Sequence, residues 1–263
     1  MKANRENSYF SPAKLNLFLK IIEKKGDGYH EIHSLFQTVS LGDTITLSLA
    51  STDSFTCNDP SLQKDNLILR AVRLFRQKTN LSFYLAIHLD KKIPIGGGFG
   101  GGSSNAATTL FALKDLLDKP IAERTLAEWG GELGSDVPFF FSSGRALCQG
   151  RGEEVFDLPR KELQAWIAHP GFSIQTQQVY RAIDYNRLGI FHNDLEEAAC
   201  RLEPRMVKIK ESLLQMGFAK VAMTGSGSGF FCLGEGVQKE IEGVSWYRVK
   251  EVYRTHRGGW YPI

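Results

Sequence analysis

The residues with the clearest chemical potential form a glycine-rich stretch from Pro94 to Ala107, Pro-Ile-Gly-Gly-Gly-Phe-Gly-Gly-Gly-Ser-Ser-Asn-Ala-Ala. Glycines lack a Cβ atom, so they can adopt positive φ and bring backbone N–H groups close to an anion. Alternating apolar residues predict a strand at 83–89, and helical spacing predicts a helix from Ala106 to Leu117. A glycine loop between a strand and a helix start predicts a phosphate site, because the helix start adds free N–H groups and a positive dipole end.

Three well-known phosphate-binding patterns fail to describe this loop. The P-loop needs a lysine after its last glycine, and Ser103 stands there instead. The dinucleotide fingerprint is met literally by Gly96, Gly98 and Gly101, but the second strand with its acidic end does not follow about 20 residues later. The downstream motifs of protein kinases are missing as well. A flexible glycine linker is the remaining alternative, and the flanking strand and helix argue against it.

The stretch resembles the pattern P-x-G-x-G-L-G-S-S-x-A-A of the GHMP kinase superfamily, with Phe99 in place of the usual leucine. Within that superfamily it is most similar to the 4-diphosphocytidyl-2-C-methyl-D-erythritol kinase family. The resemblance implies an α+β fold, with an N-terminal domain like ribosomal protein S5 and a ferredoxin-like C-terminal domain. We place these domains at residues 1–158 and 159–263, because the pattern of elements changes near Pro159. The resemblance also implies that ATP is bound by Pro94, Gly96, Gly97, Gly98, Gly100, Gly101, Gly102, Ser103, Ser104 and Asn105.

Two charged residues are candidates for catalysis. Lys14 lies in the segment Ser-Pro-Ala-Lys-Leu-Asn-Leu, and Asp136 lies in Gly-Ser-Asp-Val-Pro-Phe-Phe. By themselves, a strand lysine is more often a snorkelling surface residue, and an aspartate before a proline is equally well a helix N-cap. Both segments resemble family motifs in which the lysine is catalytic and the aspartate is the catalytic base. A carboxylate beside a cation suits the removal of a hydroxyl proton during phosphoryl transfer.

Further segments resemble the family's substrate-binding motifs. The D-G-Y-H-E segment at residues 27–31 implies that Tyr29 stacks on a cytosine ring and that His30 hydrogen-bonds its edge. Without the resemblance, this segment would be read as a hairpin turn followed by an ordinary strand. Tyr180 is the candidate for the second face of the ring, and Asn16 for a position near the acceptor. The remaining candidates belong to a second glycine loop that resembles the third superfamily motif: Gly225, Ser226 and Gly227.

The implied activity is the ATP-dependent phosphorylation of the 2-hydroxyl of 4-diphosphocytidyl-2-C-methyl-D-erythritol, a step of non-mevalonate isoprenoid biosynthesis. The implied cofactors are ATP and Mg²⁺, and the sequence does not single out a metal ligand. One alternative is another GHMP kinase, acting on homoserine or a mevalonate derivative. A second is a non-catalytic nucleotide sensor on the same fold, because a fold does not fix a function. The Tyr29-His30 pair and the segment from Gly134 to Phe140 argue against the first alternative. The presence of Lys14 and Asp136 argues against the second.

Composition limits the other possibilities. The chain has 263 residues, 42% of them apolar, and a net charge of +3, which is too small to indicate nucleic-acid binding. The polar N-terminus does not read as a signal peptide, and no apolar run approaches the about 20 residues of a membrane span. The cysteines are scattered, without a C-x-x-C pair, which indicates reduced thiols and a cytoplasmic protein without a zinc site. The oligomeric state and the role of the basic, aromatic tail from Lys250 to Ile263 cannot be read from the sequence.

Periodicity and breaker residues predict the other elements. We expect strands at 15–22, 32–39, 44–49, 166–168, 220–224, 230–233 and 246–252. We expect helices at 66–79, 125–133, 176–183, 194–202 and 204–216. The last helix has Pro204 at its first position and Gly217 as its stop. The segments Gly150–Glu153 and Asn193-Asp194 match family patterns that we interpret as structural.

Overall fold

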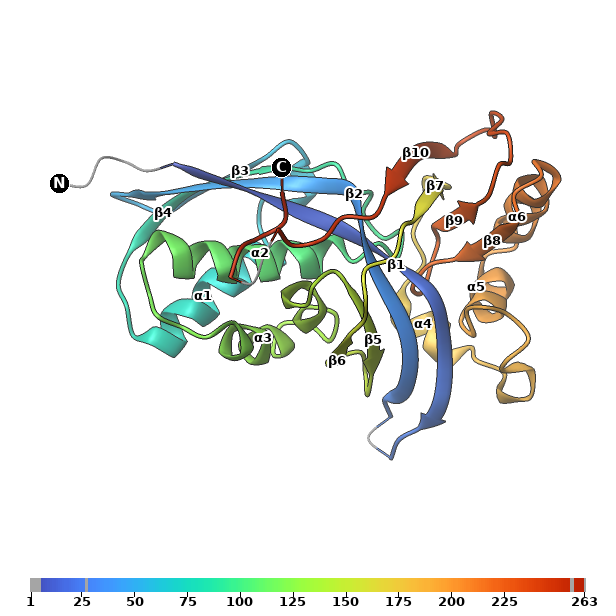
Figure 1. Cartoon of the computed structure of the whole chain (residues 1–263), viewed down its shortest axis with the longest axis horizontal. Coiled ribbons are helices and arrows are strands. Elements are labelled where there is room, and N and C mark those ends of the chain that lie inside the picture. Colours follow the sequence, from blue (N-terminus) through green and yellow to red (C-terminus); the bar gives the residue numbers. More distant parts are fainter. Residues whose placement is uncertain (1–5, 27, 256–257, 263) are drawn as a thin grey trace.

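The computed structural model describes residues 6–26, 28–255 and 258–262, so Asp27 and the tail residues His256, Arg257 and Ile263 lie outside the described residues. Helices and strands are mixed along the chain, and the described strands form two separate sheets. Figure 1 shows the first sheet with its helices at one end of the molecule and the second sheet with its helices at the other. The predicted α+β class is therefore confirmed.

The first sheet is built around two long strands. In the described part of the chain its strands are β1 (Asn7–Lys24), β2 (His30–Ala50), β3 (Ser54–Cys57), β4 (Tyr84–Asp90), β5 (Arg145–Gln149) and β6 (Glu154–Asp157). β1 pairs with β2 along almost its full length, and the other edge of β2 pairs first with β5 and then with β4. All pairs are antiparallel except β3 with β4. The β1–β2 pair bends away from the sheet toward the second unit (Figure 1).

β2 runs without a break where two strands were expected. The prediction of separate strands at 32–39 and 44–49 is wrong because Gly42 and Asp43 do not make a turn. Gly42 packs under Phe10, whose ring carbon Cζ would lie 2.3 Å from a Cβ atom at that position. The pairing with β1 shifts register at this point, because Pro12 pairs with Gly42 and Ala13 with Val39, so the extra residues of the irregularity lie in β2.

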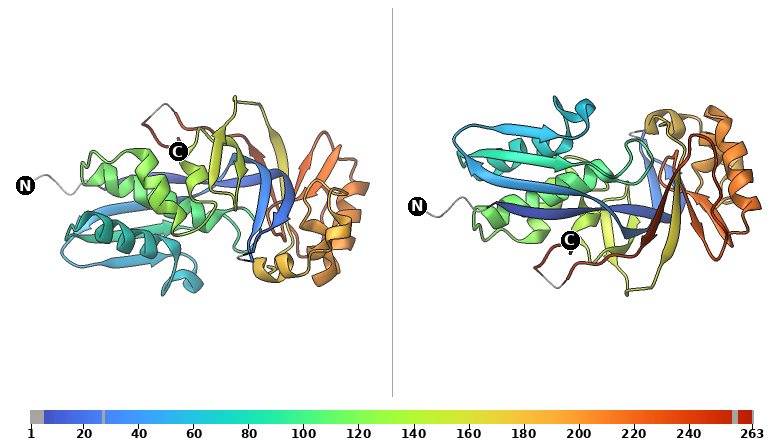
Figure 2. Two further views of the ribbon diagram at one scale, coloured as in Figure 1. Left: turned by 90° about the horizontal axis from the view of Figure 1, so that it is seen from below. Right: turned by 90° about the horizontal axis from the view of Figure 1, so that it is seen from above.

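Three helices cover one face of the first sheet (Figure 2), namely α1 (Leu67–Thr79), α2 (Gly101–Leu116) and α3 (Glu123–Gly131). The side chain of Asn66 caps α1 by accepting the Leu69 N–H at 3.0 Å, so this helix begins close to the predicted position. The core between sheet and helices contains fully buried Phe36, Phe75 and Leu110. This core fixes α2, and hence the glycine loop in front of it, against the sheet.

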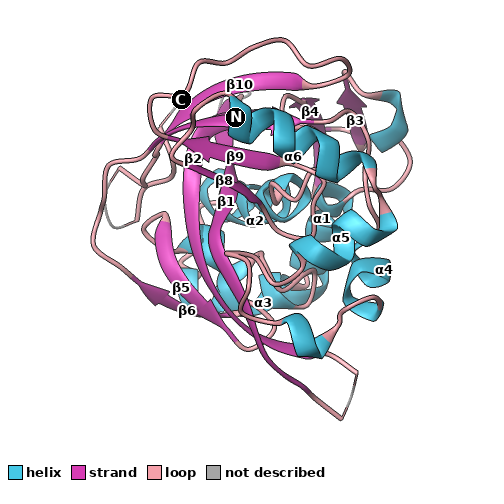
Figure 3. Cartoon of the chain, turned by 90° about the vertical axis from the view of Figure 1, so that its right-hand side faces the viewer, coloured by secondary structure: helices cyan, strands magenta, loops and turns pink. Residues whose placement is uncertain are grey.

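The second sheet has a ferredoxin-like strand order. Its strands are β7 (Gln164–His169), β8 (Lys220–Met223), β9 (Phe230–Leu233) and β10 (Ser245–Lys250). They pair antiparallel in the order β10-β7-β9-β8. Between β7 and β8 come α4 (Thr176–Arg181), α5 (Glu196–Leu202) and α6 (Arg205–Gln215), which lie on one side of this sheet (Figure 3). Residues 234–244, all of them described, contain no helix, so the second crossover of a ferredoxin-like fold is shortened to a loop.

The N-terminal end of α6 differs slightly from expectation, whereas its C-terminal end does not. Pro204 is the N-cap of α6 and not its first helical residue. Gly217 follows the C-cap of α6 with φ +82°, as predicted for a helix stop. The 3₁₀ turn η2 (Pro138–Phe141) begins after Val137, so the alternative role of Asp136 as its N-cap is not what the structure has.

The C-terminal tail returns from the second sheet to the core of the first unit. The Trp260 ring stacks on Phe111 with centroids 4.5 Å apart, and its Nε1 donates to the carbonyl of Phe10 at 2.9 Å. Buried Arg254 forms two hydrogen bonds with the Glu123 carboxylate, at 2.9 and 2.6 Å. Through Arg254 and Trp260 the tail therefore connects the last strand of one unit to the helices of the other, and we call this segment the C-terminal strap.

Candidate active site

A cavity of about 360 Å³ lies where the first sheet, the glycine loop and the second unit meet. The residues that line it include Lys14, Asn16, Gly96, Gly98, Gly100, Ser103, Asp136, Arg151, Thr176, Tyr180, Gly225, Ser226 and Gly227. They come from β1, the loop before α2, the loop before η2, the β5–β6 turn, α4 and the loop after β8. The fold thus gathers most of the sequence motifs around one space.

Three glycines of the glycine loop line this cavity. Gly96, Gly98 and Gly100 have positive φ values of +72°, +79° and +69°. The carbonyl of Gly97 accepts the Gly229 N–H at 3.0 Å, and the carbonyl of Phe99 accepts the Lys14 N–H at 2.9 Å. Gly100 is the N-cap of α2, and no side chain of the described residues caps this helix start. Amides in such a loop, at an uncapped helix N-terminus, are suited to binding phosphate oxygens.

The second glycine loop packs directly against the first. A Cβ atom on Gly98 would lie 2.2 Å from the carbonyl oxygen of Thr224, and one on Gly225 would lie 2.9 Å from the oxygen of Gly98. The Oγ1 atom of Thr224 accepts the Asn16 N–H at 2.9 Å. The Ser226 hydroxyl lies 2.8 Å from the Thr176 hydroxyl on α4. The two loops therefore form the wall of the cavity together, with β1 behind them.

Lys14 and Asp136 form an ion pair in the cavity. The Nζ atom of Lys14 lies 3.2 Å from Oδ2 of Asp136, with side-chain exposures of 4% and 28%. Lys14 also donates to the Oδ1 atom of Asn16, and its ammonium lies 4.4 Å from the centre of the Phe36 ring. Asn16 is itself held, because its Nδ2 donates to the Ser34 hydroxyl at 2.8 Å. The carboxylate thus has one fixed cationic neighbour and one side open to the cavity.

Aromatic residues gather near the outer end of β1 and β2. His30 is buried, its ring lies 5.0 Å from that of Tyr180, and its Nε2 lies 2.7 Å from the Tyr185 hydroxyl. Burial, with a smaller contribution from the charge of Lys24, lowers the pKa of His30, so the ring is neutral near pH 7. A neutral imidazole has one donor and one acceptor. Tyr29, by contrast, is 54% exposed.

Some predicted binding residues support the loop and do not line the cavity. The side chain of Asn105 donates to the Ser11 hydroxyl and to Asp43, both at 2.9 Å, and Ser104 accepts from Ser11 at 2.8 Å. Buried Asp43 in turn accepts the backbone N–H groups of Lys92 and Ile93. The predicted nucleotide-binding residues that are not among the lining residues are Pro94, Gly97, Gly101, Gly102, Ser104 and Asn105, and the predicted base-binding residues Tyr29 and His30 are not among them either.

Arg151 and Thr176 are among the cavity residues that sequence reasoning did not assign to the site. The Gly150–Glu153 segment was interpreted as a structural turn, and the turn does bond to β2, since the Ile32 N–H donates to the Gly150 carbonyl at 2.7 Å. Its arginine nevertheless lines the cavity, with the guanidinium carbon 4.4 Å from the centre of the Tyr29 ring. A charged residue between two glycines in a turn was the available signal.

The Asn193-Asp194 segment is structural, and it supports the second glycine loop. Asn193 donates from Nδ2 to the carbonyls of Met223 and Gly225 at 3.0 and 2.7 Å. Asp194 accepts the Ile21 N–H at 3.0 Å and pairs with Lys20. The segment therefore fastens both β1 and the loop after β8 to the start of α5.

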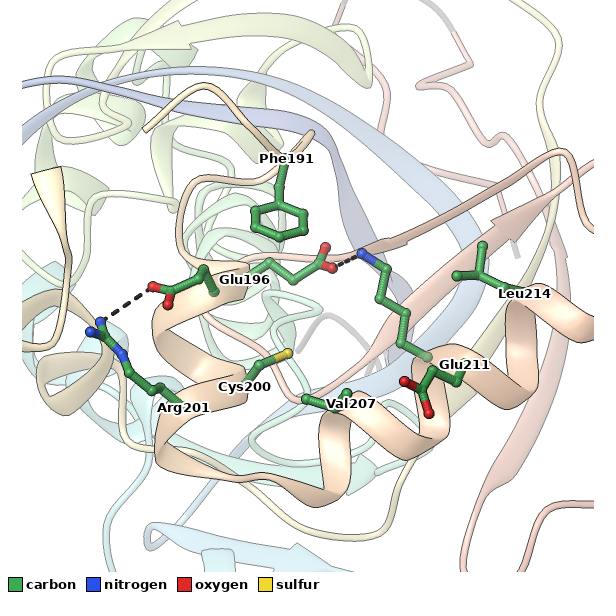
Figure 4. A pocket seen from close by; sticks show the side chains of 9 residues that line it. Phe191, Glu196, Cys200, Arg201, Val207, Glu211 and Leu214 are labelled. Carbon is green, nitrogen blue, oxygen red and sulfur yellow. Dashed lines mark hydrogen bonds and ion pairs between the residues drawn. The ribbon is translucent and has the colours of Figure 1, made fainter. Parts of the chain in front are cut away.

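A second depression, of about 380 Å³, lies between α5 and α6 (Figure 4). Its lining is mainly apolar and includes Phe191, Cys200, Val207 and Leu214. Burial, with the charge of Glu196, raises the pKa of the Cys200 thiol to about 11, so the thiol is not nucleophilic near pH 7. Glu196 is engaged as well, because it pairs with Lys210 and accepts the Met223 N–H at 3.0 Å. This depression offers no catalytic group.

The described residues contain neither a side-chain cluster for a metal ion nor a helix that could span a membrane. Among the described residues there is no group of three or more His, Cys, Asp or Glu side chains that could hold a metal ion. No helix in residues 6–26, 28–255 and 258–262 combines the length and the apolar character needed to cross a membrane.

Comparisons with known proteins agree with this geometry. The family model "GHMP kinases N terminal domain" matches residues 66–144. The 4-diphosphocytidyl-2-C-methyl-D-erythritol kinase of Protochlamydia amoebophila is 48% identical over 242 residues, which are 86% of this chain and 84% of that protein. The chain belongs to the 4-diphosphocytidyl-2-C-methyl-D-erythritol kinase family. The family's chloroplastic member from Arabidopsis thaliana is 40% identical over 86% of this chain and 67% of its own length. The chain spans 62% of the Solanum lycopersicum member.

Solved structures place the fold in the same superfamily. A crystal structure of 4-(cytidine 5'-diphospho)-2C-methyl-D-erythritol kinase has a TM-score of 0.80 and 30% identity, and covers 93% of this chain and 99% of that one. A homoserine kinase from Cytophaga hutchinsonii has a TM-score of 0.70 at 18% identity and covers 96% of each chain. The latter shows the fold alone. The expected two-domain GHMP kinase architecture is confirmed, and the protein is a kinase of this family.

Proposed function

We propose that the protein transfers the γ-phosphoryl group of ATP to the 2-hydroxyl of 4-diphosphocytidyl-2-C-methyl-D-erythritol. The observation that carries this proposal is the Lys14–Asp136 pair at 3.2 Å, in a cavity that residues of both glycine loops and Tyr180 also line. Phosphoryl transfer needs a positioned hydroxyl, a proton acceptor and groups that stabilise the charged phosphoryl oxygens. The family relationship supports the identity of the substrate.

In the proposed reaction, Asp136 accepts the proton of the substrate hydroxyl. The freed oxygen attacks the γ-phosphorus, the bond from this phosphorus to the β–γ bridging oxygen breaks, and ADP leaves. Lys14 holds its ammonium beside the Asp136 carboxylate and stabilises the negative charge that develops nearby. Asn16, which accepts a hydrogen bond from Lys14, fixes the direction of the ammonium.

Two groups of residues suit the two substrates. We assign the ATP phosphates to the backbone N–H groups of the glycine loop and the start of α2, with Gly225 to Gly227 on the opposite wall. We assign the cytosine ring to the aromatic cluster. There Tyr29 and Tyr180 offer ring faces, and neutral His30 offers one donor and one acceptor to the polar edge of the base.

Mg²⁺ is part of the proposal. It supplies positive charge that neutralises the β- and γ-phosphates of ATP. Mg²⁺ is commonly bound through one or two protein oxygens, with phosphate oxygens and waters completing the shell. The hydroxyl of Ser103 lines the cavity at the start of α2 and fits this demand, although the described residues hold no acidic cluster. We therefore expect Ser103 to be a ligand of a metal held largely by the nucleotide.

Two coarser assignments complete the proposal. We place the boundary between the two domains near Pro159, because β6 of the first sheet ends at Asp157 and β7 of the second begins at Gln164. We place the protein in the cytoplasm, because its four cysteines are free in the described chain, which suits a reducing compartment.

A substrate panel tests the proposed function. Release of ADP from ATP and Mg²⁺ is measured with 4-diphosphocytidyl-2-C-methyl-D-erythritol, homoserine and mevalonate as acceptors, and with cytidine nucleotides as competitors. We expect turnover with the first acceptor only, and inhibition by cytidine nucleotides that is competitive with that acceptor. Turnover of homoserine or mevalonate would instead support another GHMP kinase. ATP binding without turnover of any acceptor would support a nucleotide sensor.

A further inference from the structure

Arg151, in the turn between β5 and β6, has no part in the reaction described so far. Of the described residues that line the cavity, Lys14 and Arg151 are the two cations, and Lys14 is committed to Asp136. The Arg151 side chain is 49% exposed, and its Nε atom lies 3.8 Å from a carboxylate oxygen of Glu153. At this separation the ion pair is loose. The guanidinium therefore keeps donors for another partner.

The turn that carries Arg151 is firmly held. The backbone N–H of Arg151 donates to the Glu153 carboxylate at 2.7 Å, and that of Gly152 donates to the Gln149 carbonyl at 2.9 Å. The Gly150 carbonyl accepts the Ile32 N–H of β2 at 2.7 Å. The backbone position of Arg151 at the cavity is thus fixed, while its long side chain is half exposed.

Arg151 lies between the two proposed ends of the cytidyl substrate. At one end, its guanidinium carbon is 4.4 Å from the centre of the Tyr29 ring, the proposed base platform. At the other, the adjacent residue Gly152 borders the catalytic carboxylate, since a Cβ atom there would lie 3.4 Å from Oδ1 of Asp136. In the substrate, the diphosphate lies between the cytidine and the methylerythritol that carries the reacting hydroxyl. The position of Arg151 matches this middle segment.

We propose that Arg151 binds the diphosphate of the cytidyl substrate and so contributes to its selection. The inference rests on the proposed function. A guanidinium offers a planar set of donors that fits phosphate oxygens in pairs, and it adds a positive charge for the diphosphate, since the Lys14 ammonium is already paired with Asp136. The contact with Tyr29 orients the guanidinium before the substrate arrives.

The test compares inhibitors that differ only in the diphosphate. Arg151→Gln, Arg151→Lys and the wild-type full chain are assayed for the KM of each substrate and for inhibition by CDP and by cytidine. Arg124→Gln, at an arginine that is 91% exposed on α3, is the matched control. We expect Arg151→Gln to raise the KM of the cytidyl substrate and the inhibition constant of CDP about tenfold, because a charge-assisted contact is lost. Inhibition by cytidine, the KM of ATP and the melting temperature stay unchanged, and Arg151→Lys recovers part of the loss.

Three results would overturn the inference. An unchanged ratio of CDP to cytidine inhibition would show that the arginine does not contact the diphosphate. An equal loss for CDP and cytidine would mean that Arg151 acts on the base through Tyr29. A rise in the KM of ATP alone would assign the arginine to the triphosphate. In all three cases the wild-type enzyme still turns over the cytidyl substrate, so the proposed function survives. A wild-type protein that binds neither CDP nor cytidine would refute both proposals.

Discussion

The Nζ atom of Lys14, on the first strand, lies 3.2 Å from the Oδ2 atom of Asp136, in the loop that precedes η2. The core of the first unit fixes this distance, because Phe36 on β2 packs against Phe139 of η2 with ring centroids 5.1 Å apart. The Lys14 ammonium sits over the same Phe36 ring at 4.4 Å. One buried aromatic residue therefore positions both members of the pair.

Loss of either member of the pair should abolish most of the activity. We expect Asp136→Asn and Lys14→Met each to lower kcat about a thousandfold, because the proton acceptor or its neighbouring charge is removed. Binding of ATP, measured by isothermal titration calorimetry, should change little. Asp65→Asn, which disrupts the exposed pair with Arg70, is the control and should keep wild-type kcat. A kcat within tenfold of wild type in either pair variant would refute the catalytic assignment.

The contact between the two glycine loops should be sensitive to a single methyl group. In Gly98→Ala the new Cβ atom would lie 2.2 Å from the Thr224 carbonyl oxygen, at a φ of +79°. We expect the free energy of unfolding to fall by about 2 kcal/mol or more, and kcat/KM for ATP to fall with it. Denaturant titration and steady-state kinetics measure the two effects.

Gly131→Ala is the matched control for this variant. Gly131 ends α3, and a Cβ atom there would meet Pro138 at an ordinary 3.8 Å. Stability and activity should therefore stay within the range of the wild type or improve slightly. An equal effect of the two alanines would show that the contact between the loops is not tight.

The C-terminal strap should contribute strongly to stability through Arg254. Its guanidinium is 7% exposed and donates to the Glu123 carboxylate and to the Phe141 carbonyl, the latter at 2.8 Å. We expect Arg254→Gln to lower the free energy of unfolding by about 3 kcal/mol, because the hydrogen bonds of a buried charge pair are lost. In differential scanning calorimetry this corresponds to a Tm lower by about 8 °C. Arg124→Gln, which removes the exposed pair with Glu128, should shift Tm by about 1 °C or less.

Stability should fall as the pH drops below 6.5, in part because of His169. The Nε2 atom of this ring is buried without a hydrogen-bond partner among the described residues, and burial lowers the pKa of His169 from its ordinary 6.5. The unfolded chain therefore binds the proton more readily, so the contribution to stability is complete above pH 6.5 and is lost as the pH falls toward the folded-state pKa. Thermal melts from pH 7.5 to 5.0 should show a smaller drop in Tm for His169→Gln than for wild type. Equal drops would contradict this role.

Local signals in the sequence predicted much of the fold. The helix at 66–79 has the Asn66 cap and a one-sided apolar pattern, and these depend only on neighbours in the chain. The helix stop at Gly217 is likewise a local signal, because glycine readily adopts the positive φ that the structure has there. By contrast, β3, β5 and β6 were missed because strands of four or five residues carry too little alternation to stand out. The continuity of β2 was missed because it depends on the packing of Phe10 over Gly42.

The site was predicted in part, and mostly through the resemblance to a family. The phosphate-binding character of the glycine loop follows from the chemistry of its residues, whereas the approach of Lys14 to Asp136 depends on tertiary packing. The supporting roles of Asn105 and Asp43 were not foreseen, because a side chain that bonds a distant strand has no local signature. Arg151 was missed for the same reason, since its turn comes to the cavity only through β2.

The most direct test of the account is phosphorus NMR of the products formed from ATP, Mg²⁺ and 4-diphosphocytidyl-2-C-methyl-D-erythritol. The account predicts that the γ-phosphate signal of ATP is replaced by those of ADP and a new phosphomonoester, in equal amounts, while the diphosphate signals of the substrate persist. Consumption of ATP without a new phosphomonoester, or no consumption with an intact Lys14–Asp136 pair, would contradict it.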